Sequence, residues 1–154
     1  MKASDIMVTD VPTISQKSPV LEAVRLLKQN FGDASFLNAA PGLIVVNGRG
    51  ELAGILSPLS IITALLENAH ELELPTRLND EFFARLCDGI KHKQVKDVME
   101  RQAISVTEDA LLTDVAELFV KHRFQRVPVV TGKKVVGIIY RSRLLFAMAK
   151  SLLQ

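Results

Sequence analysis

The sequence contains two copies of the same series of short motifs, and this repetition limits the folds that are open to the chain. The first copy begins with Asp5-Ile6-Met7, and the second begins 92 positions later with Asp97-Val98-Met99. Val46 and Val130 occupy equivalent places but are only 84 positions apart, so the first copy holds about eight extra residues. Two copies are too few for a solenoid, and they predict two similar units packed about a pseudo-two-fold axis.

Each copy predicts the order short strand, helix, strand, strand and helix. Apolar residues at helical spacing, such as Val20, Val24 and Leu27, indicate the first helix. Glycine-containing turns, Asn47-Gly48 and Thr131-Gly132, separate the paired strands. The predicted fold class is therefore α/β (α+β), with two β-α-β-β-α repeats at residues 1–68 and 94–154 and a helical connector at 69–93.

Composition narrows the possible partners and the compartment. The chain has 154 residues, of which 48% are hydrophobic and 23% charged, and its net charge of +2 is too small to indicate nucleic-acid binding. The one cysteine excludes an intrachain disulfide and a cysteine-based zinc site. No apolar run approaches the roughly 20 residues that a membrane span needs, and the N-terminus lacks the apolar core of a signal peptide. We expect a cytoplasmic protein that binds neither membrane nor nucleic acid.

The sequence offers no catalytic or metal-binding motif. His70, His92 and His122 are scattered, and no pair has the spacing of metal ligands. There is no phosphate-binding loop, dinucleotide fingerprint or nucleophile–histidine arrangement. We therefore expect no enzyme activity, no metal and no resident cofactor.

The repeated motifs of the two copies together resemble a tandem pair of CBS domains, the Bateman module. The resemblance rests on the two Asp-apolar-Met segments, on Arg126-Val127-Pro128-Val129-Val130 with its partner Leu43-Ile44-Val45-Val46, and on Gly54-Ile55-Leu56-Ser57 with Gly137-Ile138-Ile139-Tyr140. Proteins similar to this bind AMP, ADP, ATP or adenosyl compounds in clefts between the repeats. They also commonly form homodimers through the helices that follow each hairpin, here Ser60–Ala69 and Ser142–Leu153.

The resemblance also implies a ribose-binding pattern, Gly-apolar-apolar-Thr/Ser-x-x-Asp, from which both copies depart. In the first copy Ser57 fits the pattern, but Ser60 replaces the aspartate; helix capping alone also accounts for a serine there. In the second copy Tyr140 replaces the threonine and Arg143 replaces the aspartate. A phosphate would then lie near Ser142 and Arg143, where a cation meets a helix N-terminus. Arg141 and Arg126 lie nearby in the same repeat and could bind the anion together with Arg143. Solvated surface charge is the other interpretation of these arginines.

The resemblance places an apolar wall for a base on the short first strand and the central strand of each repeat. Ordinary core packing is the other interpretation of these residues, and we expect it for Val45 and Val127 whether or not a ligand binds. The predicted ligand-binding residues are Thr13, Ile14, Val45, Ser57, Ser60, Ser105, Val106, Val127, Pro128, Tyr140, Ser142 and Arg143.

Two functions remain open at this point. The first is a regulatory module that senses an adenine nucleotide or a related anionic metabolite in a cleft between the repeats. The second is an interaction module with empty clefts, which acts through dimerisation and through a protein partner in trans. The missing aspartates favour the second function, and the arginines favour the first.

Overall fold

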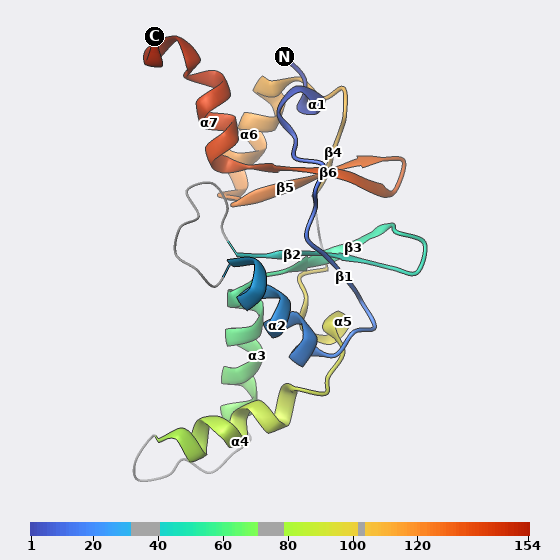
Figure 1. Ribbon diagram of the computed structural model, residues 1–154, viewed down its shortest axis with the longest axis vertical. Helices are drawn as coiled ribbons and strands as arrows, with labels where there is room; N and C mark the ends of the chain where they lie inside the picture. The colour runs from blue at the N-terminus through green and yellow to red at the C-terminus, as the bar shows by residue number, and fades with distance from the viewer. Residues whose placement is uncertain (32–40, 71–78, 102–103) are drawn as a thin grey trace.

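Two three-stranded sheets pack face to face between two groups of helices in the computed structural model (Figure 1). The structure describes residues 1–31, 41–70, 79–101 and 104–154. The architecture confirms the predicted mixed α/β fold of two similar units. In the described residues, no helix is long and apolar enough to cross a membrane.

Both sheets have the same topology. The first strand of each sheet pairs in parallel with the second, and the second pairs antiparallel with the third through a tight hairpin. The positive φ angles of the hairpin glycines, 74° at Gly50 and 62° at Gly132, suit these turns. The six strands are β1 (Thr13–Ser15), β2 (Leu43–Val46), β3 (Leu52–Leu56), β4 (Val106–Thr107), β5 (Arg126–Thr131) and β6 (Lys134–Tyr140).

Helices cover the outer face of each sheet (Figure 1). The first sheet carries α2 (Val20–Phe31), α3 (Pro58–His70) and α5 (Val95–Val98), and α4 (Asp80–Ile90) packs against α3. The second sheet carries α1 (Ala3–Ile6), α6 (Leu112–His122) and α7 (Arg141–Met148), followed by the 3-10 turn η1 (Lys150–Leu153).

The short helices α1 and α5 are exchanged between the units: each packs in the core of the unit formed by the other repeat. Ala3 and Ile6 of α1, at the start of the first repeat, belong to the core of the second unit, whereas Val95 of α5 is fully buried in the core of the first. The motif aspartates stabilise these helices, because Asp5 accepts the backbone N–H of Lys2 at 2.7 Å and Asp97 accepts that of Gln94 at 3.2 Å.

The segments that follow the short helices bridge the two sheets. Val8 pairs with Ile138 at the edge of β6, and Glu100 pairs with Ile55 at the edge of β3, which is the symmetric arrangement. Between the sheets lies a third apolar cluster, centred on Ile44, Ile138 and Tyr140. The repeats therefore share a core, as a pseudo-two-fold pair requires.

Two predictions about helices were wrong. The last helix was expected to run unbroken from Ser142 to Leu153, but α7 ends at Met148 and a 3-10 turn follows it. Val24 was expected on the buried side of its helix, but it is 44% exposed, and Ala23 is buried in its place. The small side chain of Ala23 gives a weak apolar signal in the sequence, so Val24 was assigned to the buried side in its place, whereas Val20 and Leu27 are buried as expected.

Candidate functional site

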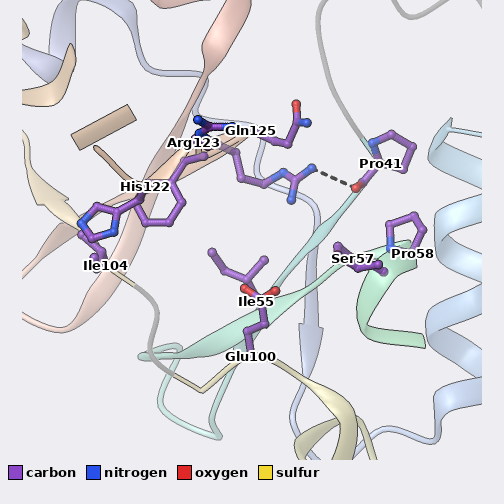
Figure 2. Close-up of a pocket in the computed structure, with 12 residues that line it drawn as sticks. Pro41, Ile55, Ser57, Pro58, Glu100, Ile104, His122, Arg123 and Gln125 are labelled. Carbon is purple, nitrogen blue, oxygen red and sulfur yellow. Dashed lines mark hydrogen bonds between the residues drawn. The ribbon is translucent and has the colours of Figure 1, made fainter. Parts of the chain in front are cut away.

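A pocket of about 550 Å³ lies between the two repeats (Figure 2). One side comes from the end of β3 and the start of α3 in the first unit, and the opposite side comes from the turn between α6 and β5 in the second. Glu100 and Ile104 add to the lining between these two sides. Its lining residues are Pro41, Ile55, Ser57, Pro58, Leu59, Glu100, Ile104, His122, Arg123, Phe124, Gln125 and Arg126.

Ser57 and Ser60 cap the helix that begins at the pocket. The Ser57 backbone N–H donates to the Ser60 hydroxyl at 3.2 Å, and the Ser60 backbone N–H donates to the Ser57 hydroxyl at 3.4 Å. The prediction that Ser60 caps this helix was therefore wrong in position: α3 begins at Pro58, so Ser57 occupies the cap and Ser60 lies in the first turn. Ser57 lines the pocket, whereas Ser60 is buried and faces a neighbouring hollow.

Arg126 is a buried cation in the wall of the pocket. Only 6% of its surface is exposed, and its Nη2 donates to the Pro41 carbonyl at 2.9 Å across the boundary between the repeats (Figure 2). Burial lowers the pKa of this guanidinium, while Tyr140 and Glu100 act in the opposite direction. A Cβ atom at residue 42 would lie 2.5 Å from the Arg126 Nη1, so a larger residue there would force the guanidinium to move.

The α6–β5 turn supplies a second arginine. Arg123 ends α6 in the left-handed conformation and lines the pocket opposite Ser57 and Pro58 (Figure 2). The rings of His122 and Phe124 stack on each other with their centroids 4.8 Å apart, which adds an aromatic surface to the same wall. The pocket therefore combines two cations, a helix N-terminus and apolar side chains.

Arg143 and Tyr140 lie outside the 550 Å³ pocket. Arg143 Nε donates to the Ile6 carbonyl at 3.2 Å, and this residue lines a separate hollow of about 330 Å³ together with Asp5. Tyr140 is buried between the two sheets, opposite Arg126 in the β5–β6 ladder. Ser142 is half-buried in the first turn of α7. The structure thus does not bring Arg143 to the pocket that contains Ser57.

The predicted apolar wall consists mostly of core residues. Val45, Val127 and Pro128 are fully buried, and Ile14 and Val106 are nearly so. Two polar members lie at the edges of the sheets: Thr13 is exposed on β1, and Ser105 is half-buried just before β4. None of these seven residues lines the 550 Å³ pocket. Their role in binding stays a prediction.

Sequence reasoning missed most of the pocket wall. It noted Arg126 only as a nearby charge and did not single out His122 or Phe124 as a wall. One signal was available: Arg126, the first residue of β5, corresponds by position to Gly42, just before β2, so an arginine in one copy replaces a glycine in the other. The structure places these two residues side by side. Glu100 and Ile104 gave no local signal, because only the crossing between the units brings them to the pocket.

The comparisons with known proteins agree with this fold. The protein MJ1426 of Methanocaldococcus jannaschii is 29% identical over 163 residues, an alignment that covers 96% of this chain and 91% of that protein. A crystal structure of CBSX2 in complex with AMP has a TM-score of 0.71 and 21% identity, covering 98% of both chains. The cytosolic domain of the Mg²⁺ channel MgtE in complex with ATP has a TM-score of 0.67 and 21% identity; the match covers 95% of this chain and 48% of the channel domain.

The family assignment rests on the two repeats themselves. The model of the CBS domain matches residues 3–67 and again residues 95–150, which together make up more than half of the chain. The two matches coincide with the two copies found in the sequence, including both Asp-apolar-Met segments. The chain belongs to the CBS-domain family, and it carries two copies of that domain.

Proposed function

We propose that this chain is a cytoplasmic, non-catalytic regulatory module that binds an adenine nucleotide or a related anionic metabolite in the pocket between its repeats. One observation carries the proposal: Arg126 and Arg123 face the N-terminal end of α3 across a pocket of about 550 Å³. A volume between about 300 and 1,000 Å³ is typical of small-molecule sites.

The chemistry of the walls suits a nucleotide. A phosphate is attracted both by the guanidinium groups and by the N-terminus of α3, a helix of 13 residues. Arg126 is buried, so its interaction with an anion is weakly screened by water. Ile55, Leu59 and Phe124 provide apolar contact for a base, and Glu100 provides an acceptor for an amino group. The structures of CBSX2 with AMP and of MgtE with ATP support the choice of ligand class.

Calorimetry tests this function directly. AMP, ADP and ATP are titrated into the full chain, and we expect binding of at least one of them. Arg126→Met keeps the length of the buried side chain but removes its charge, so it should weaken binding about tenfold or more. Arg143→Met is the matched control, because Arg143 lies outside the pocket, and it should bind as the wild type does. Circular dichroism verifies that both variants are folded.

Two results would contradict the proposal. If no adenine nucleotide binds to the wild-type chain, and mass spectrometry of the purified protein finds none carried along, the pocket is not a nucleotide site. If Arg143→Met weakens binding while Arg126→Met does not, the ligand occupies the position beside Ser142 that the sequence suggested.

A second candidate function has its own observation. Apolar side chains are exposed on α3, α7 and η1, and soluble monomers rarely expose such surfaces without a binding role. They support a homodimer or a protein partner in trans, with or without a ligand. The residues are Leu59, Ile62, Leu66, Leu145, Phe146, Met148, Leu152 and Leu153.

A further inference from the structure

Arg123 has an unfavourable backbone conformation. It ends α6 with φ 55° and ψ 38°, in the left-handed region. Among the residues that the structure describes, it alone has a positive φ without being glycine; Gly50 and Gly132 are the others with positive φ. Glycine is the usual residue at this place after a helix, because a side chain there crowds the following carbonyl.

Arg141 holds this turn in place. Its Nε donates to the Phe124 carbonyl and its Nη2 donates to the Arg123 carbonyl, each at 2.7 Å. These bonds tie down the two carbonyls of the turn that follows α6. The surrounding structure therefore fixes a conformation that the Arg123 side chain itself disfavours.

The turn places the Arg123 side chain at the rim of the pocket. Arg123 is exposed, whereas Arg126 lies deeper in the wall and is nearly inaccessible to solvent. In the described part of the chain, no carboxylate forms an ion pair with the Arg123 guanidinium. A ligand whose first phosphate lies between Arg126 and the start of α3 would present its next phosphate toward the rim.

We propose that Arg123 contacts the second phosphate of the ligand, so that the pocket prefers a nucleoside diphosphate or triphosphate to a monophosphate. The inference rests on the proposed nucleotide function of the pocket. It also explains why arginine occupies a position where glycine would be more stable: glycine would remove the cation that distinguishes these ligands.

The test compares AMP with ADP by calorimetry on the full chain and on three variants. The wild type should bind ADP about tenfold more tightly than AMP, the size expected for one added charged hydrogen bond. Arg123→Gly should weaken ADP binding about tenfold more than AMP binding and thereby abolish this preference. Arg123→Lys keeps the charge and should retain most of the preference. Lys121→Gln removes a charge from an exposed position on α6 outside the pocket and should behave as the wild type.

Thermal unfolding provides an independent readout. Arg123→Gly should raise the melting temperature by about 2 °C, because glycine adopts the left-handed conformation at little cost, whereas Arg123→Lys should not raise it. An unchanged ADP preference in Arg123→Gly, or a lower melting temperature for that variant, would overturn the inference. If the wild type binds no nucleotide, the proposed function is overturned together with this inference. If the wild type and Arg123→Gly both bind AMP and ADP with equal affinity, only this inference is overturned.

Discussion

The thioether of Met99 lies against Gly54, and the thioether of Met7 lies against Gly137 in the equivalent place of the other sheet. A Cβ atom at residue 54 would be 2.8 Å from the Met99 sulfur, and one at residue 137 would be 2.6 Å from the Met7 sulfur. The methionine of each Asp-apolar-Met segment therefore contacts the glycine of a Gly-apolar-apolar strand, once in each sheet. This contact attaches each short helix segment to the sheet.

The two glycines should differ in their tolerance of a side chain. At residue 54 the atom nearest to a methyl group would be the backbone carbonyl oxygen of Glu100, which is fixed by its pairing with Ile55. At residue 137 the three nearest atoms all belong to the flexible Met7 side chain. We expect Gly54→Ala to lower the free energy of unfolding by about 2–3 kcal/mol and Gly137→Ala by about 1 kcal/mol. Denaturant titration measures both.

A rescue variant serves as the control for this pair. Combining Gly137→Ala with Met7→Ala removes the crowding side chain, so the double variant should lose less stability than the sum of the two single changes. Equal losses for Gly54→Ala and Gly137→Ala would contradict the distinction between a rigid and a flexible neighbour.

The exchanged short helices predict that a single repeat cannot fold alone. A fragment of residues 1–68 carries α1, which belongs to the other unit, and lacks Val95, which fills its own core. It also exposes the face of the sheet around Ile44. We expect this fragment to be insoluble or molten, and a fragment of residues 9–101 to have more helix by circular dichroism. A well-dispersed amide spectrum for residues 1–68 would contradict the shared core.

The sequence predicted the order of elements because repetition and periodicity are local signals. The tight turns, the paired strands and the helix Leu112–His122 with its buried Val115 and Phe119 follow from residue spacing alone. The candidate site did not follow, because Arg126, Glu100 and the α6–β5 turn meet only through packing between units. Arg143 takes its place in the family pattern, and the structure shows its Nε donating to the Ile6 carbonyl. Its role in binding a ligand stays a prediction.

A homodimer through α3 and α7 would bury the exposed apolar residues of these helices. Leu66 and Leu145 are 59% and 58% exposed, so an aspartate at either place should leave the fold intact but put a charge into the interface. We expect Leu66→Asp and Leu145→Asp to shift the protein toward monomer in sedimentation analysis. Leu65 is not a suitable position for this test, because it packs partly on the core and a charge there would confuse dissociation with unfolding.

The matched control for the dimer uses another helix. Val120 is 80% exposed on α6, so Val120→Asp adds the same charge to an exposed apolar position outside α3 and α7. It should leave the sedimentation behaviour unchanged. A wild-type chain that sediments as a monomer at high concentration would contradict the dimer, and dissociation by Val120→Asp would place the interface elsewhere.

Tyr140 should make the protein less stable in alkali. Burial raises the pKa of its hydroxyl above the ordinary value of about 10, and Arg126 opposes this shift without cancelling it. Because the folded state holds the proton more tightly than the unfolded state, stability is unaffected by this group below pH 10 and falls as the pH rises toward the folded pKa. Tyr140 is the single tyrosine of a chain without tryptophan, so tyrosinate absorbance titrates it alone. Tyr140→Phe should show a smaller loss of unfolding free energy above pH 10 than the wild type; identical alkaline profiles would show that the hydroxyl is not the responsible group.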